Sequence, residues 1–124
     1  MSNPTTSHPD WIESNAKDGC LTLNIGRSTL NEAEGKVLTE QLRTPTDDPS
    51  IQFVILNLEQ VELITSPAIG ALIVIHKRLA TNRKMLLLTN LSTLLEEALG
   101  FLKLDEVFNI CQGPDAIKKI MQGH

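Results

Sequence analysis

Two hydroxyl residues, Thr65 and Ser66, lie at a junction between two apolar segments and are the chain's best candidates for chemistry. A nearly continuous apolar run at 51–58 precedes them and predicts a central strand buried on both faces. The apolar segment from Ala68 to about Arg83 predicts a helix. Ser66 is therefore expected near a helix N-terminus, where unpaired N–H groups and the helix dipole favour negative charge. A phosphate on this serine would be stabilised there and accessible to a partner protein.

A serine at this place also has a purely structural explanation. Serine is a favoured N-cap residue, and Pro67 suits the first helical position because its missing N–H would be unpaired there anyway. Catalysis by Ser66 would need a base, and the one internal histidine, His76, follows ten residues later on the same predicted helix. That spacing corresponds to roughly 15 Å, too far for a nucleophile–base hydrogen bond. An enzyme with a Ser66 nucleophile is thus the least favoured interpretation, and we expect no catalysis.

Composition excludes several classes of protein. The chain has 124 residues, 41% of them hydrophobic and 3% aromatic, and a formal net charge of −4. Its length predicts one domain. Its scarce aromatic residues, and the absence of any block of basic residues longer than a pair, argue against nucleic-acid binding. We find no apolar run of the roughly 18 residues that span a membrane and no apolar signal segment, so we expect a cytoplasmic protein without membrane insertion. Residues 1–10 are predicted to be a flexible arm before a single domain at 11–124.

Metal and redox chemistry are not indicated by the cysteines and histidines. Cys20 and Cys111 lie far apart in the sequence and in no paired-ligand motif. We expect both to be buried, reduced thiols, with a single disulfide as the less favoured alternative. The histidines, His8, His76 and His124, do not cluster, and no phosphate-loop or dinucleotide-binding motif occurs. The sequence therefore predicts no metal and no cofactor.

The elements around the junction alternate between strands and helices. The expected strands span residues 11–16, 20–25, 51–58, 85–89 and 107–110. The first two form a hairpin through a turn at Asp18-Gly19. The later strands are separated by helices, which predicts parallel pairs with helical crossovers. The chain is thus predicted to fold as an α/β domain with a mixed sheet, an N-terminal hairpin and helices on the crossovers.

Caps and prolines set the expected helix boundaries. Thr29 and Glu32 have capping-box spacing and begin the first predicted helix, which ends at Thr44-Pro45. Gly35 weakens this helix slightly. The helix that begins at Pro67 is apolar nearly all round, so we expect it to be deeply buried or covered in part by a partner.

Two further helices follow the strand at 85–89. Ser92 or Thr93 is expected to cap a helix that runs to about Leu102, since Thr93 and Glu96 again have capping-box spacing. A terminal helix is expected at 116–121.

Over residues 11–121 the chain resembles the STAS domains, the family named after sulfate transporters and anti-sigma factor antagonists. Three blocks carry the likeness and occur in the family's order. They are the central strand with its connector at 53–64, the junction at 65–70 and a closing block at 104–110.

The family's signature typically reads Asp-Ser-Ser-Gly-aliphatic-Gly and aligns with residues 65–70. The chain keeps the first serine, the aliphatic position and the last glycine as Ser66, Ile69 and Gly70. It has Thr65, Pro67 and Ala68 where the family has Asp, Ser and Gly. Thr65 in place of Asp removes a carboxylate next to the Ser66 hydroxyl, and Pro67 in place of Ser removes one backbone N–H donor.

The resemblance implies a regulatory binding protein in transcription control. In stand-alone members, a serine-kinase-type anti-sigma factor phosphorylates the signature serine, and a serine phosphatase resets it. By resemblance the phosphoacceptor is Ser66, with Thr65 as the lesser candidate. Partner contacts would come from Thr65, Ser66, Pro67, Ile69 and Gly70. The altered signature favours an alternative, an unswitched STAS subunit of a lipid-transport ABC system or a signalling scaffold. The oligomeric state stays open.

Overall fold

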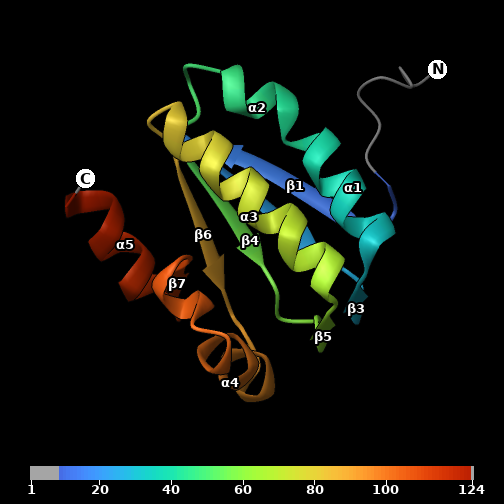
Figure 1. The fold of residues 1–124 in the computed structure, drawn as a ribbon. Helices are drawn as coiled ribbons and strands as arrows, with labels where there is room; N and C mark the ends of the chain where they lie inside the picture. The colour runs from blue at the N-terminus through green and yellow to red at the C-terminus, as the bar shows by residue number, and fades with distance from the viewer. Residues whose placement is uncertain (1–8, 124) are drawn as a thin grey trace.

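The computed structural model of the chain describes residues 9–123 and is built on one five-stranded sheet (Figure 1). Its strands, in spatial order, are β1 (Ile12–Lys17), β2 (Cys20–Ile25), β4 (Phe53–Asn57), β6 (Met85–Thr89) and β7 (Asn109–Cys111). β1 runs antiparallel to β2, and every other neighbouring pair is parallel. The predicted mixed α/β sheet is therefore confirmed. The first eight residues of the predicted arm lie outside the described residues.

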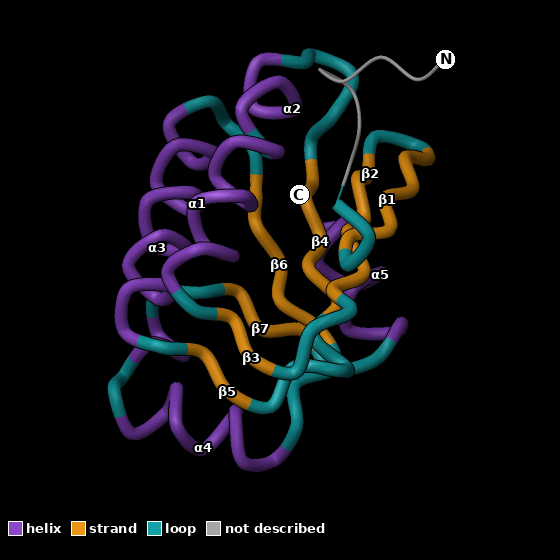
Figure 2. The backbone as a smooth tube through the Cα atoms, turned by 90° about the vertical axis from the view of Figure 1, so that its right-hand side faces the viewer, coloured by secondary structure: helices purple, strands orange, loops and turns teal. Residues whose placement is uncertain are grey.

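Helices lie on both faces of this sheet. They are α1 (Glu32–Gln41), α2 (Arg43–Asp47), α3 (Ser66–Thr81), α4 (Thr93–Phe101) and α5 (Pro114–Gly123), with a 3-10 turn η1 at Leu104–Glu106. α1 and α3 lie side by side on one face, α5 lies on the other, and α4 lies at the end where β6 finishes (Figures 1 and 2). No helix between residues 9 and 123 combines the length and apolar character that crossing a membrane requires.

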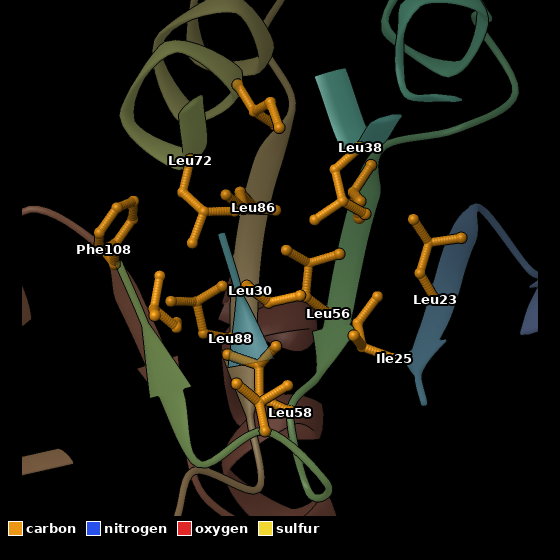
Figure 3. Packing of buried hydrophobic residues seen from close by; sticks show 14 of the residues in the cluster. Leu23, Ile25, Leu30, Leu38, Leu56, Leu58, Leu72, Leu86, Leu88 and Phe108 are labelled. Atoms are coloured by element: carbon orange, nitrogen blue, oxygen red, sulfur yellow. The ribbon is translucent and has the colours of Figure 1, made fainter. Parts of the chain in front are cut away.

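The central strand alternates between two buried faces. Val54 and Leu56 of β4 join the main core beneath α1 and α3, whereas Phe53 and Ile55 join a smaller cluster beneath α5. Leu56, Leu72 and Leu86 point toward the centre of the main core from β4, α3 and β6 (Figure 3). A strand covered on both faces explains the continuous apolar run in the sequence.

The hairpin and most later elements agree with the sequence. Asp18 and Gly19 both have positive φ, 52° and 81°, as a two-residue hairpin turn with matching twist requires. β6 spans the predicted residues. β7 begins two residues later than expected, at Asn109, because the backbone N–H groups of Val107 and Phe108 both donate to Leu104 O and so continue the turn that begins with η1. α5 extends beyond the predicted 116–121 at both ends.

The predicted start of the first helix is wrong. Asn31, not Thr29, is the N-cap of α1: its side chain accepts a hydrogen bond from Ala33 N (3.1 Å). Glu34 completes the capping box by accepting from Asn31 N at 3.0 Å. Thr29 is instead the first residue of the short strand β3 (Thr29–Leu30). Thr29 with Glu32 and Asn31 with Glu34 both have capping-box spacing. Because Thr29 and Leu30 pair with the distant residues Leu63 and Ile64, the helix begins after the later cap.

The predicted end of this helix is also wrong. α1 ends at Gln41, and Pro45 lies within the first turn of the separate helix α2. A proline is tolerated there because the first N–H groups of a helix have no intrahelical partner. Leu42, buried between the two helices, anchors the bend in the core.

α3 is covered mainly by the chain itself. Ala68, Leu72, Ile75 and Leu79 are buried. α1 covers a second flank at Gly35, where an added Cβ would lie 2.9 Å from the Cβ of Ala71. The glycine that weakens α1 locally is therefore what allows the two helices to approach.

The two cysteines are free thiols, Cys111 buried and Cys20 partly buried. Both belong to the cluster beneath α5, where Cys20 Sγ lies 3.4 Å from Met121 Sδ. Burial raises the pKa of both thiols, and the nearby Asp18 carboxylate raises the pKa of Cys20 further. Both side chains are thus kept as protonated packing groups, since the thiolate is the reactive form.

Candidate functional site

The junction between β5 (Leu63–Ile64) and α3 is fixed through its backbone. β5 pairs in parallel with β3, apart from the main sheet. Immediately after it, Thr65 N donates to Leu30 O at 2.9 Å, and Thr65 O accepts from Ile69 N at 2.9 Å. These bonds hold the start of α3 between the small sheet and the helix's own first turn.

Thr65, not Ser66, occupies the N-cap position of α3. Its backbone is extended (φ −77°, ψ 163°), and Ser66 and Pro67 are the first two helical residues. The structural interpretation of Ser66 as a helix cap is therefore wrong by one residue. The displacement follows from the pairing of β5 with β3, which keeps the chain extended as far as Thr65.

The hydroxyl of Thr65 does not cap the helix. It accepts no cap hydrogen bond from the backbone N–H groups of α3, and its Oγ1 is buried without a hydrogen-bond partner in the described part of the chain. A buried hydroxyl is inaccessible to a kinase in the folded protein. This burial argues against Thr65 as an acceptor.

Ser66 has the opposite character. Its side chain is exposed, and no hydrogen bond joins its hydroxyl to another group within residues 9–123. The first turn of α3 carries no acidic residue, so the helix itself places no carboxylate beside a negative group on Ser66, which would interact favourably with the helix dipole. The geometry permits covalent modification of this hydroxyl.

The other predicted contact residues divide between two sides of α3. Pro67, Gly70 and Val74 line a groove of about 540 Å³ against Lys36 and Glu40 of α1, which we call the α1–α3 groove. Ser66 lies one turn before Gly70 on the same stripe of the helix.

Ile69 is turned away from this stripe. It is half-buried and lines a separate groove between β5 and α4. The five predicted contact residues therefore do not form one surface. Sequence reasoning missed this second groove, although the apolar pattern of residues 94–102 is a signal for it.

His76 plays no part at the junction. It packs edge-on against Phe108, with ring centroids 5.9 Å apart, and its Nδ1 is buried without a hydrogen-bond partner among the described residues. Across residues 9–123 no group of three His, Cys, Asp or Glu side chains is placed to hold a metal. The site offers an accessible hydroxyl and two grooves, which suit binding and modification.

The comparisons with known proteins agree with this architecture. The family model for the STAS domain matches residues 12–116. No curated protein matches the chain by sequence.

Solved structures share the fold at low identity. An anti-sigma-factor antagonist (STAS) domain protein from Planctomyces limnophilus is similar with a TM-score of 0.74 and 19% identity, over 89% of this chain and 96% of that one. The anti-sigma factor antagonist SpoIIAA, in its unphosphorylated form, gives 0.68 and 12% over 89% and 97%. The murine anion transporter Slc26a9 gives 0.73 and 13%, and there the match covers 89% of this chain but 19% of the transporter. The family match extends over most of the chain and agrees with this shared fold, so the chain belongs to the STAS domain family.

Proposed function

We propose that this chain is a regulatory protein of the anti-sigma factor antagonist type, switched by phosphorylation of Ser66. The observation that carries the proposal is the exposed Ser66 side chain, which lies at the first position of α3 and is not the N-cap of that helix. The structural neighbours support it, since SpoIIAA has been solved in both an unphosphorylated and a phosphorylated form. The partners would be a serine-kinase-type anti-sigma factor and a serine phosphatase, both acting in the cytoplasm.

The switch has a simple electrostatic basis. A phosphate adds about −1.5 to −2 charges and three acceptor oxygens. On Ser66 it would lie at the positive end of α3, so the fold itself tolerates it. A partner seated on the first turn of α3 and on the α1–α3 groove would instead have to desolvate this charge. Phosphorylation would therefore weaken binding while leaving the domain folded.

A second candidate is an unswitched STAS subunit, either of a lipid-transport ABC system or of a signalling scaffold. The observation that favours it is the altered signature, with Thr65, Pro67 and Ala68 in place of the typical residues. In this case the α1–α3 groove would bind its partner constitutively.

An affinity experiment distinguishes the two candidates. Wild type, Ser66→Ala and Ser66→Asp serve as baits in native lysate, with mass spectrometry to identify partners and any phosphate on Ser66. Thr93→Asp is the matched control because Thr93 is the exposed first residue of α4, the position that Ser66 has in α3. The proposal expects a serine-kinase-type ATPase on every bait except Ser66→Asp.

Retention of the same partner by Ser66→Asp would contradict the switch. If that partner is a transporter ATPase, the structural-subunit function is supported instead.

A further inference from the structure

α4 carries more apolar surface than its packing requires. Leu95 and Leu99 anchor it in the main core. On the adjoining side Leu94 and Leu102 are 68% and 55% exposed, and Phe101 is 89% exposed. Single exposed hydrophobic residues are ordinary, but a contiguous set on one helix typically marks an interaction surface.

Leu94 and Leu102 line a groove of about 270 Å³ between α4, β5 and the first turn of α3, which we call the α4 groove. Phe101 lies outside this lining, seven residues after Leu94 and therefore on the same face of the helix. The inner wall of the groove is formed by buried or half-buried residues, among them Ile64 and Ile69. Leu63 of β5 lines it together with Leu94 and Leu102 and is 55% exposed. Figure 2 shows β5 beside α4, with the starts of α3 and α4 at the same end of the molecule. The groove is thus apolar and open along one side of a helix.

The charges around the α4 groove are mostly negative. Glu62 lines it directly. On α4, Glu97 neighbours Leu94 and Phe101 at helix spacing. Glu96 is instead turned toward Gln112 (3.5 Å), and Asp105 lies near Gly100, away from the residues that line the groove. The basic residues at 77–84 lie toward the other end of α3, away from α4 (Figure 1). The surface around the groove would therefore attract a positively charged partner.

We propose that the α4 groove binds an amphipathic helix of a partner protein, one with an apolar stripe flanked by lysine or arginine. The stripe would cover Leu63, Leu94 and Phe101, and the basic flanks would meet the surrounding carboxylates. A second copy of this chain fits less well, since two acidic rims would face each other across a symmetric contact. An anionic membrane is disfavoured by the same charges. The inference does not rest on phosphorylation of Ser66.

A synthetic peptide pair tests the charge and shape of the groove. One peptide of about 16 residues carries leucine at i, i+3, i+4 and i+7 and lysine on its polar face. Its twin has glutamate in place of every lysine. Fluorescence anisotropy with the full chain should show binding of the lysine peptide at least about tenfold tighter than the glutamate peptide. In ¹⁵N spectra the shifted amides should fall in β5, the first turn of α3 and α4.

Substitutions in and away from the α4 groove test whether the peptide binds there. The double variant Leu94→Ser, Phe101→Ser should bind the lysine peptide at least about tenfold more weakly, whereas Ala80→Ser, an exposed residue near the far end of α3, should bind as wild type. Circular dichroism verifies that both variants fold.

Three outcomes would overturn the proposal. The first is equal binding of the lysine peptide by wild type and double variant. The second is a dimer, seen by sedimentation, that the double variant loses. The third is binding to phosphatidylserine-containing vesicles that the double variant loses. Because these measurements use unmodified protein and a peptide, they are independent of the Ser66 experiment.

Discussion

Two helices of this domain begin beside a serine that follows an apolar strand, and the two serines are used differently. Ser92 is the N-cap of α4, and its hydroxyl accepts a hydrogen bond from Leu95 N at 3.1 Å. Ser66 lies one residue inside α3, exposed and without such a bond in the described residues. The start of α3 is held by tertiary contacts instead: the Thr65–Leu30 backbone bond and the packing of α1 at Gly35. A serine becomes available for regulation where other residues hold the helix.

The largest expected effect concerns the packing that holds α3. Gly35→Ala should lower the free energy of unfolding by about 1–2 kcal/mol, because the new methyl group would lie 2.9 Å from Ala71 Cβ. This net loss combines an overpacking cost of about 2–3 kcal/mol with a gain of up to about 1 kcal/mol from helix propensity. Urea denaturation measures the change. Gly100→Ala in α4 is the control, since its nearest neighbour, Asp105 Oδ2, lies 3.8 Å away, and it should be neutral or stabilising.

Ser92→Ala should lower the free energy of unfolding by about 1 kcal/mol, because the cap bond to Leu95 N is lost. Urea denaturation again gives the value. Ser92→Asp, which restores an acceptor at the N-cap, should recover most of the loss. If Ser92→Ala unfolds at the wild-type urea concentration, the contrast between the two serines has no energetic basis.

Thr65→Val should keep or raise stability, by up to about 1 kcal/mol. The substitution preserves shape and removes a buried hydroxyl that lacks a partner. The melting temperature and the urea midpoint should both stay level or rise. A clear loss of stability would mean that the hydroxyl contributes to the start of α3, and the junction would then be held by its side chain after all.

Ser66→Ala should change the free energy of unfolding least, by no more than about 0.5 kcal/mol, because the side chain is exposed and makes no cap bond. The measurement is the same urea titration, run beside Ser92→Ala. A loss equal to that of Ser92→Ala would place both serines in structural roles and remove the main support for Ser66 as a modification site.

Sequence patterns predicted the sheet well because its strands are defined by strong apolar periodicity. β4 and β6 are buried on both faces, and the hairpin turn needs the residue types found at Asp18 and Gly19. Such signals are local, so one sequence is enough to read them.

The boundaries that sequence reasoning missed depend on distant contacts. Thr29 and Asn31 each have a glutamate three residues later, and only the pairing of β3 with β5 decides between them. The same pairing moves the N-cap from Ser66 to Thr65. The location of the candidate site was therefore predictable from the sequence. The sequence did not predict that Ser92 caps its helix whereas Ser66 does not.

The face of the sheet beneath α5 differs from the face beneath α1 and α3 in how it can open. α5 is the last described element and covers Phe53, Ile55 and Leu87 with residues of a single helix. Local opening of α5 would leave the main core intact, so its amides should exchange with deuterium earlier than those of β4 and β6. In the opened form the middle of the sheet would present apolar side chains to water. Opening of α5 would therefore expose an apolar sheet face of the kind that favours aggregation.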